Sequence, residues 1–556
     1  MTLHRVKNSF TVYQCEKHAE SLFRPELSAL MIAEFGLGPY DPDTSVSVVK
    51  YALDYYVEKF NTICRDEKSY TFYKSVMMLH EDSCILAIKY PNEQLSEELG
   101  YDFIPTYRRA LKMIIEAGCD VQMESGEPIN RFSTQRIEGQ LDQLLFLAQS
   151  IMMCVSLYAE QSMISDVINI TYKNSLYVFS RRSQYIPVFE LMMQEDANHL
   201  SKAFTDTYAI EDFSIALKKA FNIDFDDVSY LITNLHESAG EWTGFQWSYL
   251  PVNLASIASV SKKDAYEFFK GLTLDKGNKM NVLDLACKPS NMNRMLYRPI
   301  IVYNVNGYNY ALVGKNSFAE AIMQITTNAI PWGKAPVEWK QNQYFKSYVH
   351  RKEDIHDKWL EDILEEKLCN LEICFERNIR NLSTSMGPYA IDIEGLGEID
   401  FLFCNHLARQ LVVLECKHLL SRYDATNMRH DYDKFVKGSK NSKSFNENIA
   451  AKVDWIRSNI ALVAEHFSLK FKLNINEIIN YNIVGCFLIN TPTIYMYSCE
   501  FRIYTLFQID AVLAGTYMDS VIIYEDVVNE RNVFAEISFP YFEKPVVMDL
   551  YFLEEL

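Results

Sequence analysis

Glycine and proline are scarce in this chain of 556 residues, which contains only 19 Gly and 16 Pro. Because these residues interrupt regular structure, their scarcity favours long helices and strands over a loop-rich architecture. The twelve cysteines form no C-x-x-C pair, and the closest two are Cys369 and Cys374. This spacing is not typical of zinc sites, and disulfide frameworks belong to small secreted chains. We therefore expect reduced, mostly buried thiols in a cytoplasmic protein.

Long hydrophobic runs are also lacking. The first residues, Met1 to Arg5, show no apolar signal core. The most apolar run, Leu144 to Tyr158, is interrupted by Gln149 and Ser150. It also falls short of the roughly 20 residues that a membrane span needs. We expect a buried core helix there and no membrane association.

An excess of positive charge is absent as well, since the formal net charge is −19. Contacts to phosphates require Lys and Arg, but only locally, because salt screens charges beyond a Debye length. Between Lys417 and Lys452, eight basic residues stand against four acidic ones. This segment could form a surface that binds a nucleic-acid backbone. Taken alone, it is more typical of a solvated helix and loop.

What is present is an ordinary globular composition, with 49% apolar and 23% charged residues. A chain of this length exceeds one hydrophobic core, so about two to four domains are expected. Helical periodicity indicates a mainly helical region over residues 1–290. If the chain is an enzyme, this region is expected to have a regulatory or target-recognition role. Residues 291–349 contain a β-hairpin signal around Asn306-Gly307 and then a helix, which predicts a bridging segment.

Residues 350–556 alternate predicted helices and strands. The expected elements are a helix over about 354–371, strands over 373–379, 398–404 and 411–417, a helical stretch over about 431–467 with a polar interruption at 438–444, and strands over 481–489 and 502–509. The order α-β-β-β-α-β predicts a mixed α/β sheet with helices packed on it.

Charged side chains gather at the ends of two of these predicted strands. Asp400 lies near the start of one strand, and Glu415 and Lys417 share a face at the end of the next. If the two strands pair antiparallel, both carboxylates and the ammonium converge. Two neighbouring carboxylates need a neutralising cation, and oxygen ligands suit Mg²⁺. The alternative is a salt-bridged strand end, in which Lys417 only neutralises Glu415.

This hairpin resembles the active-site hairpin of the PD-(D/E)xK nuclease superfamily, in its Mrr and Holliday-resolvase branch. Gly397 to Asp400 precede an apolar strand, and the next apolar strand ends in Glu415 to Lys417. Ile399 stands where the family name has Pro. The resemblance covers roughly residues 355–510. It implies a C-terminal restriction-endonuclease-like α/β core, α-β-β-β-α-β with a mixed sheet, beside the large, mainly α-helical N-terminal region.

The resemblance also implies roles for individual residues. Asp400 and Glu415 would be metal ligands for Mg²⁺ or Mn²⁺, with the main-chain carbonyl of Cys416 as a common third ligand. Lys417 would be the catalytic lysine. Glu361, on the helix before the sheet, would be an outer or second-metal carboxylate. These residues make the expected activity that of a metal-dependent nuclease.

Several basic residues after the hairpin are candidates for binding nucleic acid. Lys434 and Lys437 would occupy the polar position of the following helix, where several relatives have a Gln that is absent here. Arg422 and Arg429 lie in the same net basic segment. On the preceding helix, Glu365 is the alternative to Glu361, which lies one turn earlier.

The leading hypothesis is a magnesium-dependent endonuclease that hydrolyses DNA phosphodiester bonds. Defence against foreign DNA is a role to which many standalone proteins of this class belong. One alternative is a binding or scaffold protein that keeps the nuclease fold without its activity, and another is an RNA-cleaving nuclease. Nucleic acid, first of all DNA, is the expected partner. A second copy of the chain or another protein could bind the acidic helical region.

Overall fold

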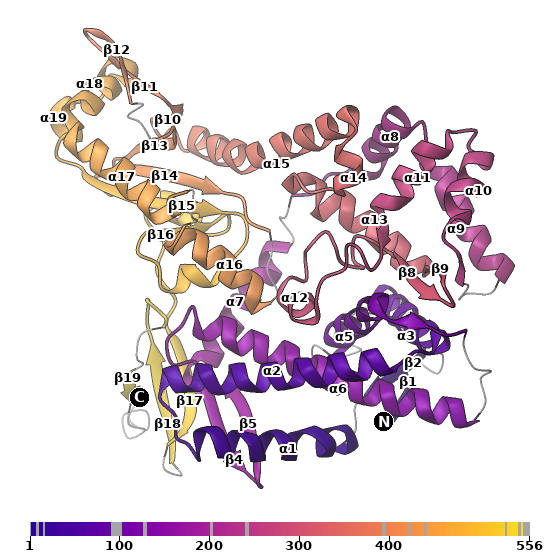
Figure 1. Ribbon diagram of the computed structural model, residues 1–556. Coiled ribbons are helices and arrows are strands. Elements are labelled where there is room, and N and C mark those ends of the chain that lie inside the picture. Colours follow the sequence, from indigo (N-terminus) through magenta and orange to yellow (C-terminus); the bar gives the residue numbers. More distant parts are fainter. Residues whose placement is uncertain are drawn as a thin grey trace. The chain divides into compact units, whose positions relative to one another are not determined.

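The chain is a mixed α/β protein with a mostly helical N-terminal region and mixed sheets in its C-terminal region, as expected (Figure 1). This computed structural model describes residues 2–6, 10–14, 17–90, 103–125, 131–200, 204–239, 244–391, 396–420, 424–438, 442–528, 531–542 and 546–548. The chain divides into two compact units. Unit 1 comprises Met1–Tyr158, Ile168–Ser180 and Thr205–Asp354, and unit 2 comprises Ala159–Val167, Arg181–Phe204 and Ile355–Leu556.

Helices dominate unit 1. Those that lie wholly or mainly in it are α1 (Lys17–Phe35), α2 (Pro42–Asp66), α3 (Tyr70–Lys89), α5 (Phe103–Ala117), α6 (Arg131–Gln161), α8 (Ala209–Phe221), α9 (Phe225–Ala239), α10 (Tyr249–Ile257), α11 (Lys262–Gly271), α12 (Val282–Cys287), α13 (Lys315–Asn328) and α14 (Val337–Lys340). Its core includes the ring of Trp339, which stacks on Phe268 with centroids 5.6 Å apart.

The strands of unit 1 are short. They are β1 (Thr2–Val6), β2 (Phe10–Gln14), β3 (Gln122–Met123), β4 (Ile168–Lys173), β5 (Leu176–Arg181), β6 (Gly244–Gln246), β7 (Thr273–Leu274), β8 (Ile300–Val305) and β9 (Tyr308–Leu312). The expected hairpin is β8–β9, and both turn residues, Asn306 and Gly307, have positive φ. Because β3 and β7 pair with β8 and β6 pairs with β9, this hairpin is part of the sheet of unit 1.

Helix α6 contains the apolar run noted in the sequence. It is long and apolar enough over Thr134–Gln161 to cross a membrane by length and composition, and 67% of the apolar window is buried inside the protein. Leu144 and Ile151 are fully buried. Core helices of soluble proteins can have the same length and composition, so this helix does not by itself indicate a membrane protein. The cytoplasmic location stays a prediction.

Unit 2 is built on a five-stranded mixed sheet. Its strands are β10 (Phe375–Ile379), β13 (Ile399–Asn405), β14 (Gln410–Lys417), β15 (Asn482–Ile489) and β16 (Arg502–Thr505), in that spatial order. The pairs β10–β13 and β13–β14 are antiparallel, whereas β14–β15 and β15–β16 are parallel.

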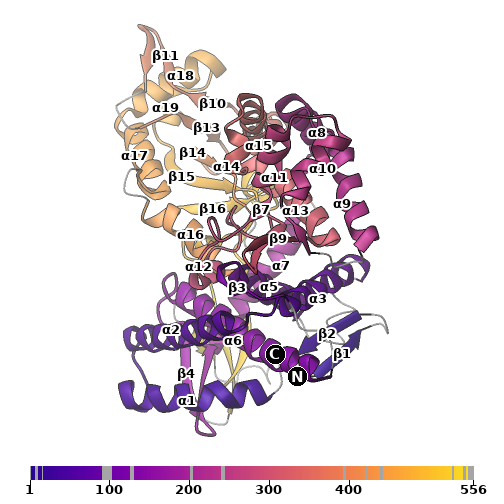
Figure 2. The same ribbon diagram turned by 45° about the vertical axis from the view of Figure 1, so that its right-hand side comes forward.

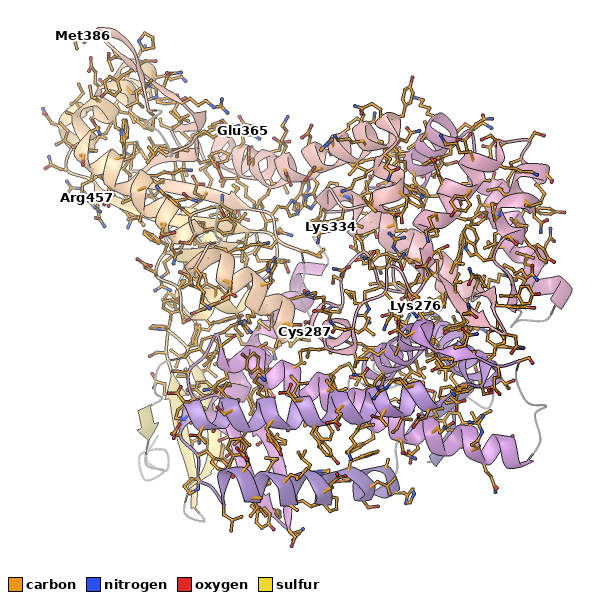
Figure 3. The ribbon with its side chains drawn as sticks, in the orientation of Figure 1. Lys276, Cys287, Lys334, Glu365, Met386 and Arg457 are labelled. Carbon is orange, nitrogen blue, oxygen red and sulfur yellow. The ribbon has the colours of Figure 1, made fainter. Side chains whose placement is uncertain are left out.

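Unit 2 also contains further helices, a two-stranded sheet and a three-stranded sheet. They are α7 (Ile186–Leu200), α15 (Gln343–Asn370, which begins in unit 1), α16 (Ala425–Val436), α17 (Phe445–Ser458), α18 (Ile460–Phe471), α19 (Ile475–Ile478), α20 (Ile509–Leu513), the hairpin of β11 (Asn381–Thr384) and β12 (Gly387–Ala390), and the strands β17 (Ile522–Val528), β18 (Arg531–Ile537) and β19 (Val546–Met548). Figure 3 shows the exposed Met386 at the turn of the β11–β12 hairpin.

Helices α15 and α17 lie on opposite faces of the sheet (Figure 2). Leu360, Leu364 and Leu368 of α15 form a core with alternate residues of the strands, including Phe401 and Leu414. Because neighbouring residues of a strand point to opposite faces, Asp400 and Glu415 lie on the α17 face. Asp400 and Glu415 therefore lie on the face of the sheet opposite the leucines of α15.

Candidate active site

The β13–β14 hairpin brings Asp400 and Glu415 together. Phe401 pairs with Leu414, so the two acidic residues are the next neighbours along the antiparallel ladder. The backbone N–H of Cys416 donates to Asp400 Oδ2 at 2.9 Å. The backbone nitrogen of Asp400 lies 3.5 Å from Glu415 Oε1. The expected convergence of two carboxylates is therefore present in the structure.

Lys417, at the end of β14, lies between these carboxylates. Its Nζ is 3.2 Å from Glu415 Oε2 and 3.7 Å from Asp400 Oδ2. The Lys417 and Asp400 side chains are 21% and 15% exposed, whereas Glu415 is only 5% exposed. Asp400 and Lys417 are therefore the members of this group with more contact with solvent.

A second lysine, Lys452 of α17, completes the cluster. Its Nζ lies 2.5 Å from Glu415 Oε1 and donates to the carbonyl of Glu398 at 2.6 Å. The Lys452 side chain is 6% exposed. The sequence interpretation counted this residue only as one of several basic residues. Together the four side chains form what we call the carboxylate–lysine cluster: Asp400, Glu415, Lys417 and Lys452.

The local sequence explains why α17 presents Lys452 to the sheet. Ser444 and Glu447 form a capping box that fixes the start of the helix. Ile449, Val453 and Ile456 are buried at helical spacing, and Lys452 lies on the same face. Arg457, labelled in Figure 3, is exposed instead.

Gly485 of β15 allows α17 to approach the sheet closely. A Cβ atom at this position would lie 2.8 Å from a methyl group of Val453. A larger residue would therefore push α17 away from the strand. This close approach holds Val453, and with it the neighbouring Lys452, against the charged face of the sheet.

Burial shifts the protonation of the cluster. Burial raises the pKa of Asp400 to about 6, and Lys417 and Glu415 act on it in opposite directions. For Lys417, burial alone would lower the pKa, but the carboxylates of Glu415 and Asp400 raise it overall. Lys417 is therefore protonated at neutral pH, and burial makes Asp400 harder to ionise than an exposed aspartate.

Glu361 lies on α15, and its hydrogen bonds among the described residues go to Arg377 of β10, with Nη2 2.9 Å from its Oε2. Arg377 also pairs with Glu365, which Figure 3 labels on α15. Burial, together with the charges of Asp400 and Glu361, raises the pKa of the Cys416 thiol. Glu361 is thus close to β14 but held by an arginine, and its metal-binding role stays a prediction.

The basic residues of α16 are paired within their own helix. Lys434 Nζ lies 3.4 Å from Asp431, and Lys437 Nζ lies 2.8 Å from Asp433. Arg429 Nε is 3.8 Å from the same Asp433. Among the described residues, neither Lys434 nor Lys437 forms an ion pair with the carboxylate–lysine cluster. Their nucleic-acid-binding role stays a prediction.

Arg422, the fourth basic candidate, lies outside the residues that the structure describes. Its role in binding nucleic acid stays a prediction.

An aromatic stack follows Lys417 along the chain. The rings of His418 and His356 stack with centroids 3.5 Å apart, and Trp359 stacks on His418 at 5.3 Å. His418 Nδ1 donates to the carbonyl of His356 at 2.8 Å. Burial, and then His356, lower the pKa of His418 to about 3. The ring is therefore neutral at pH 7 and adds no charge to the site.

The donor set of the carboxylate–lysine cluster fits a hard divalent cation. Asp400 and Glu415 offer carboxylate oxygens, and the main-chain carbonyl of Cys416 follows directly in sequence. Mg²⁺ and Mn²⁺ prefer such oxygen ligands. The buried position of Glu415 and the raised pKa of Asp400 show a place where additional positive charge would stabilise the ionised carboxylates.

Unit 1 contains another group with metal-ligand spacing among the described residues: His80, Cys84 and Glu320. His80 Nδ1 lies 3.7 Å from Cys84 Sγ. Glu320, however, is already paired with Arg108 at 2.6 Å and with Lys112 at 3.4 Å. One carboxylate between two cations leaves no negative charge for a metal ion to neutralise, so the group is better explained as a hydrogen-bonded structural cluster.

No family model, no curated protein and no solved structure matches this chain.

Proposed function

We propose that the chain is a magnesium-dependent nuclease that hydrolyses phosphodiester bonds of DNA. The observation that carries the proposal is the convergence of Asp400, Glu415 and Lys417 on one face of a mixed sheet. Acidic side chains rarely end buried apolar strands without a partner or a function. Here two of them meet, and burial disfavours the ionised form of one.

The element order of unit 2 supports a restriction-endonuclease-like core. Helix α15 precedes β10, β13 and β14, helices α16 and α17 follow, and β15 joins the sheet parallel to β14. The β11–β12 hairpin is an addition between the first two strands of this order. The order and the mixed pairing agree with the α-β-β-β-α-β core that the resemblance implies.

Asp400 and Glu415, with the carbonyl of Cys416, would hold the divalent cation. When bound, such a cation neutralises charge on the phosphate and lowers the pKa of water. Lys417 remains protonated, because the carboxylates raise its pKa. It therefore contributes positive charge and hydrogen-bond donors to the phosphate or to the attacking water, and does not remove a proton.

A cleavage assay tests the proposal. The purified chain is incubated with supercoiled plasmid, linear DNA and RNA, each with Mg²⁺ or with EDTA, and Lys417→Ala is compared with the wild type. Arg457→Ala is the matched control, because it removes an exposed positive charge of α17 that pairs with Asp454 of the same helix. We expect Mg²⁺-dependent DNA cleavage that Lys417→Ala abolishes and Arg457→Ala retains.

Equal cleavage by the wild type and Lys417→Ala would contradict the proposal. Cleavage of RNA alone would change the substrate class and keep the site, because the same chemistry serves both nucleic acids. The proposed defence against foreign DNA rests on the resemblance to the superfamily. The proposed cytoplasmic location rests on the scattered cysteines of the sequence.

A second candidate is a nuclease-fold binding protein without activity. The observation that favours it is the charge balance of the cluster, in which two lysines face two carboxylates. A salt-bridged strand end would have the same balance. Absence of cleavage under all conditions, together with retained DNA binding, would support this candidate over the enzyme.

A further inference from the structure

Lys452 gives Glu415 a second ammonium partner. One carboxylate oxygen, Oε1, lies 2.5 Å from Lys452 Nζ, and the other, Oε2, lies 3.2 Å from Lys417 Nζ. Both oxygens of a nearly buried carboxylate are therefore in ion pairs. The two lysines differ in their surroundings, because Lys417 is 21% exposed and Lys452 only 6%.

The other contacts of the two lysines also differ. Lys417 is shared with Asp400 Oδ2 at 3.7 Å, and so it lies between the two carboxylates. Lys452 also donates to the carbonyl of Glu398 at 2.6 Å, and this carbonyl belongs to the backbone just before β13. Lys452 thus ties Glu415 Oε1 to the backbone. Oε2 is the oxygen that shares an ammonium with Asp400.

We propose that Lys452 is a positioning residue that holds Glu415 through Oε1, leaves Oε2 for a divalent cation shared with Asp400, and lowers the affinity of the site for that cation. This inference rests on the proposed function, because it takes Asp400 and Glu415 as the metal ligands. It deepens that function because a residue of α17 then sets the metal concentration at which the site is occupied. The lysine acts through Glu415 and is not itself a catalytic residue.

Two effects of opposite sign follow from this geometry. A fixed ammonium repels a divalent cation, so its removal increases metal affinity. A unit charge about 5 Å from a divalent ion changes the affinity about tenfold even at the dielectric constant of bulk water, ~80. The same removal frees the Glu415 carboxylate to rotate, so the cleavage rate with saturating metal falls. Damage to the fold would lower both quantities.

The experiment measures Mn²⁺ binding to the full-length protein by the electron paramagnetic resonance signal of free Mn²⁺, at pH 7.5 and constant ionic strength. Lys452→Met removes the charge and the hydrogen bonds, whereas Lys452→Gln removes the charge and keeps an amide donor. Arg457→Met is the matched control, because it also removes one positive charge, from a side chain 60% exposed on α17. Circular dichroism and the thermal midpoint establish that each variant is folded.

We expect both neutral Lys452 variants to bind Mn²⁺ at least about tenfold more tightly than the wild type. The control should change the affinity by less than about twofold, because solvent screens an exposed charge. Cleavage at saturating Mn²⁺ should fall more in Lys452→Met than in Lys452→Gln. If Lys452→Met does not fold, the affinity of Lys452→Gln decides. Unchanged or weaker binding in the folded neutral variants would overturn the inference.

Two further variants separate this inference from the proposed function. Asp400→Asn and Glu415→Gln each remove a proposed metal ligand. If they bind Mn²⁺ as the wild type does, the proposed function fails. If they lose Mn²⁺ while the Lys452 variants bind like the wild type, only the role of Lys452 fails.

Discussion

Two clusters of buried charge, one in each unit, contain a carboxyl group whose pKa is shifted, and the two shifts have opposite directions. In unit 1, Glu320 stands alone between Arg108 and Lys112, and these cations outweigh burial and lower its pKa to about 2. In unit 2, Asp400 shares its surroundings with Glu415, and burial raises its pKa to about 6 despite two lysines. The first cluster already satisfies its carboxylate. The second would be stabilised by a further cation, and this difference separates a structural cluster from a candidate metal site.

The largest expected contrast is in cleavage. Glu415→Gln should lower the cleavage rate by about 10³-fold, because it removes a proposed ligand of the divalent cation that neutralises charge on the phosphate. Glu320→Gln should leave the rate within about twofold. Initial rates on plasmid DNA at saturating Mg²⁺ check both values. Similar losses in the two variants would mean that the clusters do not differ in function.

The next contrast is in stability. Glu320→Leu should lower the free energy of unfolding by about 3 kcal/mol, because Arg108 and Lys112 lose their common partner in a buried site. Denaturant unfolding of the whole chain, followed by circular dichroism, gives this value. Arg457→Leu on the exposed side of α17 is the control and should cost less than about 0.5 kcal/mol. If Glu320→Leu lowers the free energy of unfolding no more than this control does, the unit 1 cluster does not stabilise the fold.

The pH dependence of stability should have opposite signs in the two clusters. The pKa of Asp400 is raised from 3.8 to about 6, so between these values the folded state binds more protons and stability falls as pH rises. The pKa of Glu320 is lowered from 4.5 to about 2, so its contribution is present above pH 4.5 and is lost as pH falls towards 2.

In metal-free buffer, Asp400→Asn should therefore be more stable than the wild type at pH 7.5, by on the order of 1–3 kcal/mol. The difference should disappear near pH 4. Glu320→Gln should be less stable than the wild type at pH 7.5, and this difference should shrink below pH 4.5. Thermal midpoints measured with EDTA from pH 3 to pH 8 test the direction of each stability difference. If the midpoints of all three proteins change with pH in the same way, the two clusters do not differ in their effect on stability.

The smallest expected effect concerns α16. Lys434→Ala and Lys437→Ala should each weaken DNA binding by about twofold to threefold and lower the salt dependence by no more than about one charge. The reason is that both lysines already pair with Asp431 and Asp433. Fluorescence anisotropy at several salt concentrations measures this. A loss of more than about tenfold would place the main DNA contacts on this helix.

Local sequence patterns were enough to predict the hairpin that carries the site. Strands expected over 398–404 and 411–417 are β13 (Ile399–Asn405) and β14 (Gln410–Lys417). Alternation of side chains within these strands placed Asp400, Glu415 and Lys417 on one face. The Asn306-Gly307 turn was likewise predictable, because few residues tolerate its positive φ values.

The part played by Lys452 depends on contacts that local patterns do not contain. Lys452 lies 37 residues beyond Glu415 and 52 residues beyond Asp400, and Gly485 from a later strand allows its helix to approach the sheet. One local signal was available, because Lys452 interrupts the apolar face formed by Ile449, Val453 and Ile456. The grouping of Arg181–Phe204 with unit 2 is also a matter of packing, which sequence periodicity does not reveal.

Mn²⁺ titration of the wild type, Asp400→Asn and Glu320→Gln is the most direct test of whether the unit 2 cluster, and not the unit 1 cluster, binds a divalent cation. We expect one Mn²⁺ site in the wild type, its loss in Asp400→Asn and its retention in Glu320→Gln. Retention in Asp400→Asn together with loss in Glu320→Gln would contradict this expectation and would assign metal binding to unit 1.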